Sequence, residues 1–386
     1  MANVMKPITG AFINKSATLK PITDKFIVKS GLDSHGAPIN QLKPVTSMWI
    51  VKEDINRDFA FVVRIVSAGG SFNFDVQSGQ VGRFDVDWGD GTIQSINIAG
   101  NSTITHAYSA AGDYTVTILN YVSGYIYFGS RNQLLKVLSP FPYNSSRTSF
   151  SGCFRNCDKL ISIPPSLFVK NYNVTNFSSC FYGCSSLSNI SDKLFSSNYN
   201  VNNFSTCFSE CSSLLNIPAN LFANNPNVTT FQSCFTNAVA ITSIPPRLFD
   251  NNPLVTNFSS CFRGANRLLS VPSNLFNNNI NATIVAYCFD GCTSLATIPA
   301  NLFHNNTQIA NFQACFRNCS SLNVDISSFF ANNVRGNQFL ICFDGCVNIH
   351  GTAEPIWLRG GVLYGQYCFR NCTGLSNYLS IPDYWR

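Results

Sequence analysis

The sequence is short of charge. Only 11% of its 386 residues are Asp, Glu, Lys or Arg, whereas an average soluble domain has roughly 25%. The net charge of +6 is not gathered into a basic cluster interleaved with aromatic residues, so we expect no nucleic-acid partner. A surface with so little charge has to be built from neutral polar groups, as in extracellular or virion proteins.

Long apolar runs are also missing. No stretch approaches the roughly 18 consecutive apolar residues of a membrane-spanning helix. The first residues, MANVMKPITGAFINKSATLKP, lack the continuous apolar core of a signal peptide. We therefore expect neither membrane insertion nor ordinary secretory export.

Catalytic signatures are missing as well. The sequence has no G-x-S-x-G, no phosphate-cradling glycine loop and no H-E-x-x-H. Asp33, Ser34 and His35 have the residue types of a triad, but adjacent residues cannot orient one another for proton relay. We predict a protein that is not an enzyme, with no catalytic residue, no cofactor and no metal site.

Cysteine, in contrast, is abundant, and all 16 cysteines belong to one array. Nine of them, each followed by phenylalanine, recur at intervals of 27 residues, with a last interval of 26. A fixed period of this size is typical of stacked repeats, each of which buries its apolar face against its neighbours. The row consists of Cys153, Cys180, Cys207, Cys234, Cys261, Cys288, Cys315, Cys342 and Cys368.

The spacing within one repeat predicts helices. In FSSCFYGC, Phe177, Cys180, Phe181 and Cys184 lie at i, i+3, i+4 and i+7, which is one face of an α-helix. A short strand, ended by proline in most repeats, and a second helical turn are expected to follow. An asparagine that closes this turn predicts either a helix C-cap or an asparagine ladder. These asparagines are Asn171, Asn198, Asn225, Asn252, Asn279, Asn306 and Asn333.

Three roles for the cysteines compete: metal ligands, disulfides between repeats, and buried apolar filler. In two repeats Cys234 and Cys261 are kept while the second cysteine is replaced by Ala238 and Ala265. Alanine can replace a small buried group, but it would leave a metal ligand or a bridge partner alone. We interpret the row as a structural cysteine ladder of free thiols, which implies folding in a reducing compartment.

The chain before the repeats divides into two parts. Residues 1–52 contain three degenerate copies of a Lys-Pro segment, KPITGAFINKS, KPITDKFIVKS and KPVTSMWIVKE. Because proline favours short extended segments, we predict an N-terminal extended arm that anchors the protein to a partner; a flexible leader is the alternative. The residues assigned to anchoring are Lys6, Pro7, Lys20, Pro21, Lys43 and Pro44.

Residues 53–130 predict strands, because FAFVVRIV, GRFDVDWGDGT, STITHAY and DYTVTIL alternate or are rich in β-branched and aromatic residues. WGDGT, followed by THAY and GDYTVT, resembles the PKD (polycystic kidney disease) family, which implies an immunoglobulin-like β-sandwich. Asp87 and Asp90 have the residue type of calcium ligands, but turn-forming aspartates are the favoured interpretation.

The repeats resemble the BspA-like leucine-rich-repeat surface proteins, whose units carry F-x-x-C-x-x-L-x-x-I and are adhesive; the resemblance covers about residues 60–375. It implies a fold of mixed β and α/β class: the arm, a PKD-like sandwich, then a leucine-rich-repeat-type solenoid of 27-residue units over 131–375, with a cap at 376–386. A row of small polar residues on its strands forms the predicted binding face; a sheet surface that only contacts solvent is the alternative. These are Ser162, Asn189, Asn216, Ser243, Ser270 and Thr297.

The combination of adhesive repeats with no export signal predicts a bacteriophage virion component: a fibre, receptor-binding or capsid-decoration element. The arm would dock on a capsid or tail protein, and the repeats would meet a glycan or protein of the host surface. A homo-oligomer is compatible with this arrangement. The alternatives are an adhesin on a bacterial cell surface and an intracellular protein-binding scaffold.

Overall fold

The computed structural model describes residues 58–77, 82–98, 100–121, 125–360 and 363–386, together with four two-residue strands nearer the N-terminus. Contacts within the chain define two compact units, Met1–Arg57 and Asp58–Arg386.

In the first unit the described residues form two short antiparallel pairs. The strands are β1 (Lys20–Pro21) paired with β4 (Trp49–Ile50), and β2 (Phe26–Ile27) paired with β3 (Lys43–Pro44).

The second unit begins with two antiparallel sheets. One has five strands in the order β12-β5-β10-β7-β8, and the other has three in the order β11-β6-β9. The bounds are β5 (Phe59–Ile65), β6 (Ser71–Gln77), β7 (Gly82–Asp87), β8 (Ile93–Ile98), β9 (Ser102–Ala107), β10 (Gly112–Leu119), β11 (Tyr125–Tyr127) and β12 (Leu134–Val137).

Alternation of buried and exposed side chains explains these strands. Phe59, Phe61, Val63 and Ile65 point into the core from β5, while the residues between them are partly or fully exposed. Side chains two residues apart lie on the same face of a strand, so this pattern buries one face of each sheet. The buried rings of both sheets form one core.

The hairpin between β7 and β8 depends on turn-forming aspartates. Asp87 Oδ1 accepts a hydrogen bond from the backbone N–H of Gly89 (2.9 Å), and Asp90 Oδ1 accepts one from Thr92 (3.0 Å). Gly89 has φ +80°, and a Cβ there would lie 2.4 Å from the carbonyl oxygen of Thr115. Only glycine fits this position, because both its φ and its close approach to β10 exclude a side chain.

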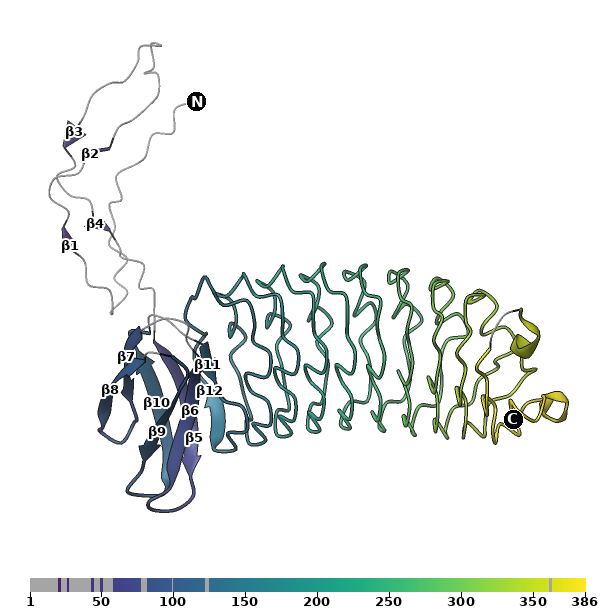
Figure 1. Ribbon diagram of the computed structural model, residues 1–386, viewed down its shortest axis with the longest axis horizontal. Coiled ribbons are helices and arrows are strands. Elements are labelled where there is room, and N and C mark those ends of the chain that lie inside the picture. The colour runs from purple at the N-terminus through teal and green to yellow at the C-terminus, as the bar shows by residue number, and fades with distance from the viewer. Residues whose placement is uncertain are drawn as a thin grey trace, which may run out of the picture. The chain divides into compact units, whose positions relative to one another are not determined.

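The rest of the second unit is a stack of coils, which we call the coil stack; Figure 1 shows the coils following one another from β12 to the C-terminus. Each coil corresponds to one sequence repeat. A series of parallel bridges joins equivalent residues of successive coils, from Ser149 through Asn176 and Asn203 to Tyr364. Rings stack in the same way: Phe181 and Phe208 have centroids 5.4 Å apart and planes inclined by 3°.

The predicted mixed β and α/β class is wrong, since the repeats contain no α-helix. In the described residues the only helices are two 3-10 turns, η1 (Ile356–Leu358) and η2 (Tyr378–Ser380), near the C-terminus. The array is therefore not the α/β leucine-rich-repeat solenoid that the resemblance implied. It is built from turns, and the domain before it from antiparallel sheets.

Two consecutive type II turns take the place of the predicted helix. The N–H of Cys180 donates to the carbonyl of Phe177 (3.1 Å), and the N–H of Cys184 to that of Phe181 (3.1 Å). The third residue of each turn is left-handed: Ser179 has φ 54° and Gly183 has φ 71°. A positive φ at this position defines a type II turn. Two such turns in series place side chains inward at the same i, i+3, i+4 and i+7 spacing that a helix would.

Within these two turns, N–H groups that do not close a turn bond to the next coil. Phe177 donates to the carbonyl of Asn203 (3.0 Å), and Ser179 to that of Ser205 (2.8 Å). Alternate N–H groups therefore serve the turn and the stack. In this way a segment without regular secondary structure satisfies its backbone.

The asparagines that recur once in each repeat form a ladder rather than helix caps. Asn198 Nδ2 donates to the backbone carbonyl of Asn171, 27 residues earlier, at 2.9 Å. The same contact recurs from Asn225 to Asn198 (2.9 Å) and onward to Asn333. All seven asparagines are buried, so each one links its coil to the preceding coil inside the core.

Both ends of the coil stack are covered. At the start, the N–H of Phe128 donates to the carbonyl of Cys153 (2.8 Å), and the Phe128 ring stacks on Phe154 (5.5 Å), so the sandwich core continues into the first coil. At the end, Tyr367 and Phe369 donate to the carbonyls of Tyr384 (2.9 Å) and Trp385 (2.8 Å). The last residues thus take the place of a further coil.

Candidate functional site

The predicted binding face lies at the surface. All six of its residues, Ser162, Asn189, Asn216, Ser243, Ser270 and Thr297, are exposed. Parallel bridges join Lys136 to Ser162 and Ser270 to Thr297. Equivalent residues of successive coils therefore lie in one column, and none of the six is charged.

A second column, one residue earlier in each coil, was missed by the sequence reasoning. Ile161, Leu215 and Leu269 occupy it in alternate coils and are 44%, 50% and 56% exposed. Ser188 and Thr242 occupy the coils between them. A large apolar residue at a phase that is otherwise polar was the available signal. Together the two columns form a neutral surface with regularly placed apolar side chains.

The cysteine ladder lies entirely in the core. All sixteen cysteines are buried and free of disulfides, and Ala238 and Ala265 are buried in the same way. The Sγ–H groups bond within the stack: Cys184 donates to the carbonyl of Phe154 (3.1 Å). Burial raises the pKa of Cys153 to about 11. A buried, protonated thiol packs as a compact apolar group.

Four of the six residues assigned to anchoring lie in short strands that the structure describes. Lys6 and Pro7 lie outside the described residues. Lys20 and Pro21 form β1, and Lys43 and Pro44 form β3, which pairs with β2.

The WGDG segment builds a polar cluster in the sandwich. Asp90 Oδ2 lies 2.8 Å from His106 Nε2, and the His106 ring stacks on Trp88 at 4.8 Å. Partial burial raises the pKa of Asp90, but hydrogen bonds from His106 and Thr92 outweigh it, and the pKa is lowered overall. Within the described residues, no three His, Cys, Asp or Glu side chains are placed to hold a metal ion.

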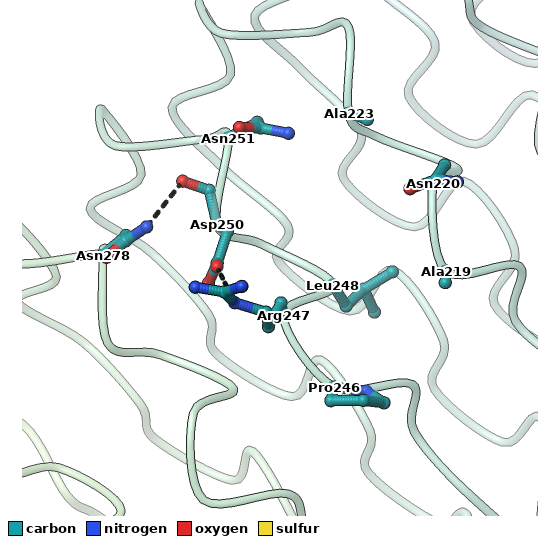
Figure 2. Close-up of a pocket in the computed structure, with 9 residues that line it drawn as sticks. All are labelled: Ala219, Asn220, Ala223, Pro246, Arg247, Leu248, Asp250, Asn251 and Asn278. Carbon is teal, nitrogen blue, oxygen red and sulfur yellow. Dashed lines mark hydrogen bonds and ion pairs between the residues drawn. The ribbon is translucent and has the colours of Figure 1, made fainter.

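One depression lies among the proline-containing turns of the middle coils (Figure 2). It has a volume of about 500 Å³ and is lined by residues that include Asn220, Arg247, Asp250 and Asn278. Arg247 Nε lies 2.8 Å from Asp250 Oδ2, and Asn278 Nδ2 donates to the Asp250 backbone carbonyl (3.2 Å). The two charges neutralise each other within one turn. The depression therefore offers a polar contact surface without a nucleophile or a free base.

A column of alternating charge, also missed from the sequence, lies on the second of the two turns in the later coils. Asp290 contacts Arg263 (3.0 Å) and Arg317 (2.8 Å), and its side chain is only 4% exposed. Arg370 pairs with Asp344 (2.5 Å). These residues share one phase of the repeat, two positions after the cysteine that precedes phenylalanine. Ion pairs between coils, rather than a ligand, account for them.

No helix in the described part of the chain is long and apolar enough to cross a membrane.

Comparison with known proteins gives one family. The family described as "Mycoplasma protein of unknown function, DUF285" matches residues 148–274 and 249–352, which together are more than half of the chain. No curated protein matches. The match supports the coarser part of the resemblance, a family of repeat-containing proteins. The phage origin and the PKD-like identity of the sandwich stay predictions.

One solved structure, titled "Crystal structure of TLR13-ssRNA13 complex", is similar at 12% identity with a TM-score of 0.15. The match covers 64% of this chain and 46% of the other chain, so this protein spans less than half of the length of the other chain. A TM-score this low carries no argument about fold or function.

Proposed function

The chain belongs to the DUF285 family of repeat proteins, and from this premise we propose a non-enzymatic binding protein that is displayed on a biological surface. The observation that carries the proposal is the predicted binding face, six exposed, uncharged residues in one column of the coil stack. A rigid column of small polar groups can meet a partner through many weak, repeated contacts.

The proposed setting is a bacteriophage virion. Residues 1–52 fix the protein to a capsid or tail protein, and the coil stack meets a glycan or protein of the host surface. Sixteen buried free thiols support folding in a reducing compartment such as the cytoplasm of an infected cell.

A second candidate is an adhesin on the surface of a bacterial cell. The description of the matching family names a cellular bacterium, Mycoplasma, and this favours a cellular location. Both candidates share the binding role and differ in where the protein is displayed.

Immunogold electron microscopy of a producing culture and of the particles it releases separates the two. Label on particles supports the virion component, and label on intact cells supports the adhesin. Label confined to the cell interior would contradict both candidates and support the third alternative, an intracellular protein-binding scaffold.

Binding is tested with the full chain on host cells. Substituting Asn216→Arg and Ser243→Arg places two bulky charges on the predicted binding face and should abolish adsorption. Arg is also introduced at Asn224, an exposed position outside the face, as a matched control that should leave adsorption unchanged. Equal adsorption by both variants would refute the assignment of this face.

A further inference from the structure

A separate side of the coil stack carries no charge over six successive coils. Five consecutive residues of each coil, between the buried asparagine and the first phenylalanine of the turns, form this side, which we call the neutral face. In six successive coils it contains no Asp, Glu, Lys, Arg or His. These segments are 172–176, 199–203, 226–230, 253–257, 280–284 and 307–311.

One edge of the neutral face is a stripe of exposed apolar and aromatic side chains. Tyr172 and Tyr199 are 47% and 55% exposed, and Ile280 is 56% exposed. The ring of Tyr172 stacks on Tyr143 at 5.5 Å, and the Tyr172 hydroxyl donates to that of Tyr143 (2.9 Å). Rings held side by side in water indicate a binding surface, since contiguous exposed apolar groups are disfavoured without a partner. The full stripe is Tyr143, Tyr172, Tyr199, Pro226, Pro253 and Ile280.

Beside the stripe lies a column of threonines whose donors are already used. The hydroxyl of Thr229 donates to the Asn202 carbonyl (3.1 Å), and that of Thr283 to the Thr256 carbonyl (3.1 Å). Their oxygens remain as acceptors, in a geometry that the stack fixes. Asparagines next to the stripe are fixed similarly, as Asn227 Nδ2 donates to the Tyr199 carbonyl (3.1 Å).

Between stripe and threonines the surface is hollowed into an open groove of about 660 Å³, within the usual range of roughly 300–1,000 Å³ for ligand sites. Its walls combine methyl groups, hydroxyls and amides. The lining residues are Thr229, Leu254, Thr256, Ile280, Asn281, Thr283, Thr307 and Gln308.

We propose that this groove, together with the stripe that continues from Ile280 along earlier coils, binds an uncharged polysaccharide laid along the stack. The C–H faces of sugar rings can pack on the tyrosine, proline and isoleucine side chains, and sugar hydroxyls can donate to the threonine and asparagine oxygens. A chargeless surface matches a chargeless ligand, because a charged partner would lose hydration there without gaining a counter-charge. Both molecules repeat in one direction, so successive sugars meet equivalent groups.

The proposal rests on the proposed binding role but places its ligand on a different side from the predicted binding face, so it adds a second binding surface to the coil stack. It names the chemical class of the ligand, a neutral glycan, and excludes an acidic one.

Isothermal titration calorimetry of the full chain tests it. The probes are hexasaccharides of β-1,4-glucose, β-1,4-N-acetylglucosamine, α-1,4-glucose and β-1,4-mannose, with hexagalacturonate as the anionic control. At least one neutral probe should bind and the anionic one should not. The double variant Tyr172→Ala/Tyr199→Ala should weaken binding on the order of tenfold, since an aromatic contact is worth about 0.5–1.5 kcal/mol. Thr256→Arg, which fills the groove, should abolish binding.

A matched control is Tyr367→Ala/Tyr384→Ala, two tyrosines that are 38% and 54% exposed and lie outside the neutral face. It should bind like the unaltered chain. Far-ultraviolet circular dichroism and thermal melting establish that every variant folds.

Three results would overturn the inference. The first is no binding of any neutral probe, and the second is binding of hexagalacturonate as strong as that of the neutral glycans. A third is an oligomer, seen by sedimentation velocity, that Thr256→Arg dissociates, because the groove would then hold a second copy of the chain. Host-cell adsorption lost with Ser243→Arg but kept with Thr256→Arg would leave the proposed function standing while this inference fails.

Discussion

The sandwich and the coil stack bury their side chains in different ways. In the sandwich, alternation along β5 assigns every second residue to the core, and this pattern belongs to strands alone. In the coil stack, Phe177, Cys180, Phe181 and Cys184 are all buried, yet their spacing is shared by a helix and by two type II turns. A burial pattern therefore identifies the inward residues in both regions, but it identifies the backbone conformation in only one.

The largest expected effect compares a core ring in each region. Phe222→Ala removes a ring that lies 4.6 Å from Phe231 and 4.8 Å from Phe204, and Phe74→Ala removes one from the sandwich. Each substitution should lower the free energy of unfolding by about 3–5 kcal/mol. Because coils contact only their neighbours, Phe222→Ala should also split unfolding into two transitions in urea. One two-state transition for Phe222→Ala would show instead that the stack unfolds as a unit.

A medium effect tests the turns directly. Gly264 has φ +71°, and a Cβ there would lie 2.1 Å from Asn237 Oδ1. Gly264→Ala should therefore destabilise the coil stack by about 1–3 kcal/mol in chemical denaturation. Gly360→Ala, where a Cβ meets nothing within 4 Å, is the control. An α-helix at this position would instead be stabilised by alanine, so a gain in stability would refute the turn.

The smallest effect belongs to the sandwich. The folded pKa of Asp90 lies below its ordinary value, so its contribution is present above the unfolded pKa and is lost as pH falls through the folded pKa. Asp90→Asn should remove less than about 1 kcal/mol at neutral pH, since the pair lies near the surface. Melting of the variant and of the unaltered chain should converge towards pH 2. A constant difference in melting temperature between pH 7 and pH 2 would contradict this electrostatic origin.

The sequence carried a signal that separates turns from helices. Four residues after each cysteine of the ladder stands a second cysteine or an alanine, as at Cys184 and Ala238. The residue just before this second position is Gly or Asn in eight of nine repeats, and all nine have positive φ. Glycine and asparagine are the residues that accept the left-handed conformation, and both are poor in a helix interior. Their recurrence one residue before Cys184 and its equivalents indicates a turn that ends there. The i, i+3, i+4, i+7 spacing alone predicts a helix, whereas the recurrent glycine or asparagine predicts the turn that the structure contains.

Other features could be predicted only in part. The asparagine phase was evident, and the ladder was one of its two interpretations; the choice needed the carbonyls of the preceding coil, as with Asn198 and Asn171. The exposure of the Ser162 column follows from its polarity. The lack of charge along the neutral face can be read from the sequence. The groove could not be foreseen, because it depends on how five residues of each coil are placed relative to those of the next.

Tyr384 and Trp385 cover the last coil, and this contact does not depend on how many coils precede it. Two carbonyls of the tail occupy the donors that a further coil would use, so a second molecule cannot extend the array by joining at this end. Length is then free to vary internally. A 27-residue segment inserted between two middle coils would lengthen the chain's reach and leave the tail and the sandwich as they are.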